Sequence, residues 1–141
     1  MVKSDRSDAG TKGLYVITIG VDPDTADGIR QCTLQENGIF AGEVAGYSPR
    51  QGQLQPLLET RPSGALVFVI DFDKDSKLAV QTAGSLSLMF GGRAAIMAVS
   101  EKSDPTLILE AMRAGCCEYL CKPLVAGEVC KALTRVSSRR L

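Results

Sequence analysis

Short apolar runs alternate along this chain with segments whose apolar residues recur at helical spacing. The runs lie at residues 14–19, 39–45, 64–71, 94–100 and 118–123. Those at 64–71 and 94–100 contain almost no polar side chain, and a strand that is apolar on both faces belongs in a parallel sheet covered by helices. The pattern therefore predicts five strands of such a sheet.

The intervals between the runs predict five helices. One begins at a typical start signal, Asp104 as the cap and Pro105 as the first helical residue. Apolar side chains at helical spacing give each helix a face for the sheet. The helices are expected within residues 22–38, 52–60, 76–90, 104–115 and 125–136, and the apolar stripes of the last three are Ala79, Ala83, Leu86 and Phe90; Ile108, Ala111 and Met112; and Val125, Val129, Leu133 and Val136.

Strands and helices that alternate five times predict an α/β fold, a doubly wound parallel sheet with helices on both faces. The flavodoxin-like strand order 2-1-3-4-5 is the leading topology. Its ligand crevice lies at the carboxyl ends of the strands, around the switch between the first and third strands. We expect this domain to cover residues 14–137, with a flexible tail at 1–13 and a tail or the start of a linker at 138–141.

Composition and charge narrow the classes of function. The 141 residues, 45% of them hydrophobic, suffice for one domain. Basic and acidic residues both number 16, so no positive excess is available to bind nucleic acid. No apolar run approaches the roughly 20 residues of a membrane span. Five cysteines, an odd number without a signal-peptide pattern, indicate a cytosolic protein with unpaired thiols.

Polar side chains collect where the predicted strands end. A carboxylate, a hydroxyl and an ammonium in one crevice are the groups that a phosphorylated Asp needs, because the hydroxyl and the ammonium can each bond a phosphoryl oxygen. Alternatively, the carboxylate at the end of the third strand only caps that strand and bonds the Lys or loop amides. The residues at the strand ends are Asp22, Asp71, Asp73, Ser100, Lys122 and Pro123.

This arrangement resembles the receiver domain of two-component response regulators over roughly residues 14 to 137. In that family an Asp that ends the third strand is phosphorylated, a Ser or Thr ends the fourth, and a Lys followed by a usually cis Pro ends the fifth. The resemblance implies that Asp71 is the phosphoacceptor equivalent and that Ser100 and Lys122 contact the phosphoryl group. It also implies a cis bond before Pro123.

The runs "FVIDFDKD" at 68–75 and "AVSEKSDPTLILEAMRAGCCEYLCKPL" at 98–124 are similar to the atypical receiver domain that precedes the ATPase in TadZ/CpaE-type Flp pilus-assembly proteins. In that group the receiver-like part is implicated in dimerisation and in polar placement of the secretion platform. The likeness implies a bacterial cytoplasmic homodimer, linked in a longer parent chain to a MinD/ParA-like ATPase domain. No GxxxxGK[ST] loop occurs in these residues, so we expect an excised or solitary N-terminal module.

The metal site departs from the receiver pattern. Ordinary receivers place two adjacent acids after the first strand to hold Mg²⁺, and Gly20 and Val21 stand there instead. Asp22, Asp71 and Asp73 are weak metal candidates, because Mg²⁺ requires several oxygen ligands in near-octahedral geometry. Without the metal, phosphoryl transfer loses its main charge neutraliser. We therefore expect a pseudo-receiver with no cofactor and no enzymatic activity.

Three functions are compared on this basis. The first is an interaction module that pairs through the fourth helix, the fifth strand and the fifth helix, with Glu110, Arg113, Tyr119 and Lys131 as interface candidates. The second is a phosphorelay receiver that is phosphorylated on Asp71. The third, a flavin- or nucleotide-binding enzyme, is disfavoured because the loop "GVDPDT" is acidic and has one glycine.

Other metal and redox sites are disfavoured by the same sequence. A Zn²⁺ site lacks ligands, since the chain has no His and no separated CxxC pairs. Cys116 and Cys117 follow a helix C-terminus, where the helix dipole disfavours a thiolate. Cys121 and Cys130 are expected to be small core residues. The stretch "GVDPDTADG" lacks the acid at position twelve of an EF-hand calcium loop.

Overall fold

The protein is described here by a computed structural model that covers residues 14–45 and 65–139. Five parallel strands form one sheet in the order β2-β1-β3-β4-β5, which confirms the predicted topology. The strands are β1 (Leu14–Ile19), β2 (Ile39–Val44), β3 (Ala65–Asp71), β4 (Ala94–Ser100) and β5 (Glu118–Cys121). β1 pairs with both β2 and β3, so the chain reverses its direction of winding between the first and third strands.

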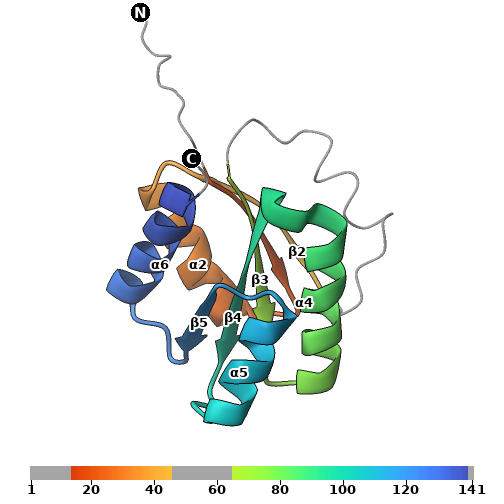
Figure 1. Ribbon diagram of the computed structural model, residues 1–141. Helices are drawn as coiled ribbons and strands as arrows, with labels where there is room; N and C mark the ends of the chain where they lie inside the picture. Colours follow the sequence, from red (N-terminus) through yellow and green to blue (C-terminus); the bar gives the residue numbers. More distant parts are fainter. Residues whose placement is uncertain (1–13, 46–64, 140–141) are drawn as a thin grey trace, which may run out of the picture.

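Helices cover both faces of the sheet, as Figure 1 shows. The helices α4 and α5 pack on one face, whereas α2 and α6 pack on the other. Their bounds are α2 (Pro23–Gln35), α4 (Ser76–Phe90), α5 (Pro105–Ala114) and α6 (Ala126–Arg139), with a 3₁₀ turn, η1 (Gly91–Arg93), after α4. The helix predicted at 52–60 and the tail predicted at 1–13 lie outside the described residues.

Short polar residues and Pro start the helices where the sequence indicates. Asp104 accepts a hydrogen bond from the Thr106 N–H at 3.1 Å, and Pro105 begins α5. The same helix ends at Gly115, whose φ of 120° favours glycine. A Cβ there would lie 2.8 Å from Ser87 Oγ. Gly115 is therefore required by both its backbone conformation and its neighbour.

The central strand β3 is buried at all seven positions, because helices cover both of its faces. Phe68, Ile70 and Phe72 face the layer of α4 and α5. Val67 and Val69 face the layer of α2 and α6. The expectation of strands that are apolar on both faces is therefore met at the centre of the sheet.

The predicted apolar face of α4 is confirmed, since Ala79, Ala83 and Leu86 are buried and the Phe90 ring packs 5.2 Å from that of Phe68. Two other predicted stripes are partly wrong. In α5 the buried residues are Leu107 and Ala111, and Met112 is exposed, because the helix packs one position away from the predicted phase. Val125 is also exposed, because it precedes α6 and only its carbonyl joins the helix, by accepting the Glu128 and Val129 N–H groups.

The five cysteines form no disulfide in the described part of the chain. Burial raises the pKa of the Cys116 thiol to about 12, which makes it a poor nucleophile. The prediction that Cys121 lies in the core is wrong: it is exposed, because β5 is an edge strand on which Leu120 faces inward and the next side chain outward. Cys130 is half-buried.

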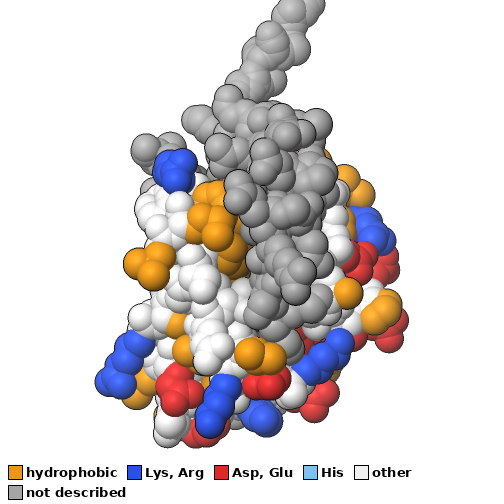
Figure 2. All heavy atoms as spheres, turned by 90° about the vertical axis from the view of Figure 1, so that its right-hand side faces the viewer, with side chains coloured by type: hydrophobic (Ala, Val, Ile, Leu, Met, Phe, Trp, Pro, Cys, Tyr) orange, Lys and Arg blue, Asp and Glu red, His pale blue; other side chains and the backbone are white. Residues whose placement is uncertain are grey.

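The described helices include none that is long and apolar enough to cross a membrane. Figure 2, which faces the side of the molecule at the right of Figure 1, shows Lys, Arg, Asp and Glu side chains gathered in its lower part. The parallel strands finish at this lower end in Figure 1. On this side of the molecule, charged side chains therefore lie mostly toward the end at which the strands finish.

Candidate functional site

The carboxyl ends of β1, β3, β4 and β5 bring the predicted site residues together. Asp71 is the last residue of β3 and Ser100 the last of β4, and both are buried. Asp22 follows β1 as the N-cap of α2, and Lys122 follows β5. Parallel strands end at the same edge of a sheet, which is why residues up to 100 positions apart meet here.

Lys122 lies at the centre of the carboxylates. Its ammonium is 2.9 Å from Asp73 Oδ2 and 3.3 Å from Asp22 Oδ1, and its shortest contact is with Asp71 Oδ2. The Lys122 side chain is 12% exposed and that of Asp71 is 2% exposed. Burial lowers the pKa of Lys122, but the three carboxylates outweigh burial and raise that pKa above its ordinary value. The ion pairs therefore keep a nearly buried ammonium charged.

Asp73 binds a second set of donors. Its Oδ1 accepts the Ser100 hydroxyl at 2.6 Å, and both of its oxygens accept the Glu101 N–H, at 3.0 and 3.1 Å. The Asp73 N–H donates to Asp71 Oδ1 at 2.7 Å. Burial raises the pKa of Asp73, but the bonds from Ser100, Lys122 and Glu101 lower it below its ordinary value. The Asp73 carboxylate therefore accepts hydrogen bonds from both Ser100 and Glu101, the two residues at which β4 passes into the following loop.

The backbone fixes these side chains. The Lys122–Pro123 bond is cis, as the resemblance to receivers implies. The Lys122 N–H donates to the Ser100 carbonyl at 2.8 Å, which holds the end of β5 against the end of β4. Gly20 has a φ of 68°, so the position that carries an acid in ordinary receivers serves here as a turn out of β1.

The residues at this site do not fit Mg²⁺. Gly20 has no side chain and Val21 offers no oxygen ligand, so the acidic pair is absent from the loop after β1. The three nearby carboxylates bind the Lys122 ammonium instead. Within the described ranges, no group of three or more His, Cys, Asp or Glu residues is placed to hold a metal ion. The local chemistry is that of an internal ion-pair cluster.

Sequence reasoning identified Asp73 as a weak metal candidate and missed its bonds to Ser100 and Glu101. Its position two residues after Asp71 is a usable signal, because residues 71 and 73 flank the buried Phe72, and Asp73 lies in the turn that directly follows β3. The structure shows a contact between Asp71 and Lys122, which agrees with either alternative for Asp71, the phosphoacceptor or the capping carboxylate.

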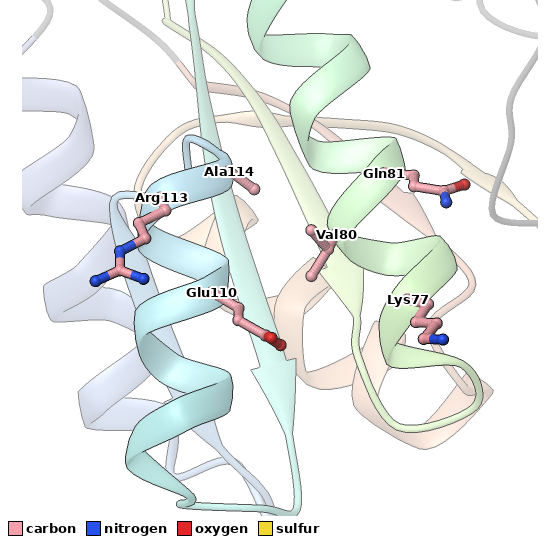
Figure 3. Close-up of a pocket in the computed structure, with 6 residues that line it drawn as sticks. All are labelled: Lys77, Val80, Gln81, Glu110, Arg113 and Ala114. Carbon is pink, nitrogen blue, oxygen red and sulfur yellow. The ribbon is translucent and has the colours of Figure 1, made fainter.

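The four interface candidates do not form one patch. Glu110 and Arg113 line a groove of about 440 Å³ between α4 and α5, together with Lys77, Val80, Gln81 and Ala114. Figure 3 shows Val80 and Glu110 directed toward the space between the helices, whereas Arg113 points away from α4.

Tyr119 lines a different hollow of about 230 Å³, formed by β5 and the start of α6. Val125 and Cys121, both exposed, also line it. Lys131 is an exposed residue of α6. We call the part formed by Tyr119, Cys121 and Val125 the β5–α6 surface.

The stability of the domain is expected to fall as the pH drops from about 3.8 toward about 2. Burial raises the pKa of Asp22, but the Thr25 hydroxyl and N–H and the Lys122 ammonium outweigh it and lower that pKa from 3.8 to about 2. Because the pKa of Asp22 is lower in the folded state than in the unfolded state, the folded state binds fewer protons at low pH. The contribution of Asp22 to stability is therefore fully present above pH 3.8 and is lost as the pH falls toward about 2. The lowered pKa of Asp73 acts in the same direction.

Urea midpoints measured from pH 2 to 5 test this dependence, with Asp22→Asn as the matched variant because Asn also caps helices well. The variant should show a smaller change of midpoint over this range than the unchanged protein. Equal pH dependence in the two proteins would contradict the assignment to Asp22.

Solved structures with this fold include receivers and pilus-assembly proteins. A protein of Burkholderia pseudomallei assigned to pilus assembly matches with a TM-score of 0.71 at 17% identity, over 96% of this chain and 98% of that one. A CpaE pilus-assembly protein of Burkholderia thailandensis matches with a TM-score of 0.65 at 21% identity, over 89% and 98%. A response regulator of Thermotoga maritima matches with a TM-score of 0.67 at 15% identity, over 89% and 98%.

No protein-family profile and no curated protein sequence matches the chain. The strand order and the helices on both faces agree with the structural matches. The chain therefore has the α/β fold of receiver domains, a fold that response regulators share with pilus-assembly proteins.

Proposed function

We propose that this chain is an atypical receiver domain that acts as a protein–protein interaction and dimerisation module, independent of phosphorylation. The observation that carries the proposal is that the site's polar groups bind one another. Lys122 is engaged by Asp71, and Ser100 by Asp73. A phosphoryl group on Asp71 would have to compete with Asp73 for both Ser100 and Lys122, and would add negative charge to a cluster that already holds three carboxylates and one ammonium.

The setting we propose is pilus assembly of the Flp/Tad type, or a related signalling system, in the bacterial cytoplasm. Two of the structural matches are assigned to pilus assembly, and they cover 96% and 89% of this chain. In this setting the domain would adjoin a MinD/ParA-like ATPase domain in a longer parent chain. The role needs no bound cofactor, no nucleic acid and no catalytic step.

The β5–α6 surface supports self-association. Val125, which lies between β5 and α6, is 63% exposed. It lines the same hollow as Tyr119, a residue of the edge strand β5. Exposed apolar and aromatic side chains with charged neighbours are typical of the centre of an interface. Glu128 lines the same hollow and Lys131 lies one turn further along α6, so both signs of charge are available to pair across a two-fold axis.

Sedimentation equilibrium tests this proposal. We expect the unchanged domain to dimerise and Val125→Glu to weaken the dimer by about tenfold or more, because it places a charge at the centre of the contact. Leu88→Glu is the matched control, since Leu88 is 91% exposed on α4. A domain that stays monomeric at high concentration would contradict the proposal.

Independence from phosphorylation is tested with Mg²⁺ and then beryllofluoride, a mimic of aspartyl phosphate. We expect the dimer constant to stay the same and the backbone amides of residues 20–22, 71–73, 100 and 122 to show no saturable NMR shift. Saturable shifts at these residues, with a changed dimer constant, would favour the alternative of a phosphorelay receiver modified on Asp71.

A further inference from the structure

The loop between β4 and α5 comprises residues 101–104. At its start, three hydrogen-bond donors bind one carboxylate, that of Asp73. The Ser100 hydroxyl, the Glu101 N–H and the Lys122 ammonium all bind Asp73, at distances from 2.6 to 3.1 Å. The Ser100 hydroxyl is neutral and buried, the Glu101 donor is a backbone N–H, and the Lys122 ammonium carries a full charge. A hydroxyl, an amide and an ammonium together form a site for a small anion.

The bonds continue from Asp73 along the loop to the protein surface. Ser100 is fully buried, and its Oγ also accepts the Lys102 N–H at 3.0 Å. The Lys102 carbonyl accepts the Tyr119 hydroxyl at 2.8 Å. Tyr119 lines the hollow of the β5–α6 surface. Bonds to an ionised acceptor are stronger than neutral ones, so the first link of this series is the strongest.

We propose that Asp73 is a built-in anion that fills the anion site at the start of residues 101–104 and holds this loop in one arrangement without any bound ligand. Asp73 acts here as a positioning residue: it orients Ser100 and Glu101, and through them Lys102. Its carboxylate comes from the turn after β3, so it adds no mobile group and no binding equilibrium to the loop.

This inference goes beyond the proposed function. It concerns the conformation of one loop and would hold for a domain that remains monomeric. It also predicts that a free anion can replace the Asp73 carboxylate. Once the Asp73 side chain is shortened, the three donors face a space that a small carboxylate can enter. Formate has the same charge and the same two oxygens as the group removed.

The test is chemical rescue of Asp73→Ala, read by amide hydrogen exchange with NMR detection. We expect protection of the Glu101 and Lys102 N–H groups to fall by about tenfold or more in this variant, because the Glu101 N–H loses its charged acceptor and Ser100, which accepts the Lys102 N–H, loses the carboxylate that orients it. Added formate should restore protection at these two amides, and chloride at the same ionic strength should not. Amides of the buried strand residues Val67 and Val69 report whether the fold itself is intact.

Two further variants make the outcome decisive. Glu101→Ala should leave Lys102 protected, since Glu101 contributes through its backbone N–H and not its side chain. If Asp73→Ala does not fold, Asp73→Asn replaces it, and we expect partial loss of protection, because the amide keeps an acceptor oxygen and loses the charge. Wild-type protection in either Asp73 variant, or equal effects of formate and chloride on Asp73→Ala, would overturn the proposal. A failed dimer assay would not affect this result.

Discussion

Replacing Lys122 with Met is expected to destabilise the domain by about 3–5 kcal/mol, the cost of leaving a buried charge without its partner. Asp71 is the residue most affected, because its side chain is only 2% exposed and it would lose its ion pair with the Lys122 ammonium. Met has nearly the length of Lys, so the substitution changes the charge more than the packing. Asp22 and Asp73 lose the same counter-ion, which leaves three carboxylates near one another.

Urea unfolding at pH 7 measures this effect. Lys74→Met is the control, because Lys74 is exposed and its substitution should change stability by no more than about 0.5 kcal/mol. Adding Asp71→Asn to Lys122→Met should recover part of the loss, because it removes the buried charge. An unchanged urea midpoint in Lys122→Met would show that the carboxylates are solvated well enough to need no partner.

Truncating Phe72 to Ala is expected to cost about 3–5 kcal/mol. Its side chain is fully buried against the layer of α4 and α5, and its N–H donates to the Val99 carbonyl at 2.9 Å. Phe72 also separates Asp71 from Asp73, so a cavity here would loosen the turn that places both carboxylates. We therefore expect the stability and the order of the site to fall together.

Thermal or urea unfolding of Phe72→Ala measures the loss of stability, and NMR shifts of the Asp73 and Ser100 amides report the order of the site. Phe72→Leu is the matched variant, because it keeps much of the apolar volume and should cost clearly less than the alanine variant. Site amides that keep their wild-type shifts in Phe72→Ala would mean that the hydrogen bonds alone hold the turn.

Much of the fold could be predicted from local sequence patterns. Runs such as "ALVFVI" are apolar on both faces, as strands in a covered parallel sheet are, and capping pairs such as Asp104-Pro105 begin a helix through bonds within four residues. The order of strands and helices then leaves few topologies. The meeting of Asp71, Ser100 and Lys122 at one edge followed from that topology, without knowledge of any side-chain contact.

Which of these groups bind each other could not be predicted from the sequence and is visible only in the folded chain. The pairing of Ser100 with Asp73, and of Lys122 with three acids, depends on the loop conformations after each strand, which no short periodic pattern encodes. The same holds for Cys121, whose exposure results from the edge position of β5. Local strand patterns in the sequence were enough to predict which residues stand at the strand ends. That these residues neutralise one another follows from the packing of the folded chain, which brings together partners that are far apart in the sequence.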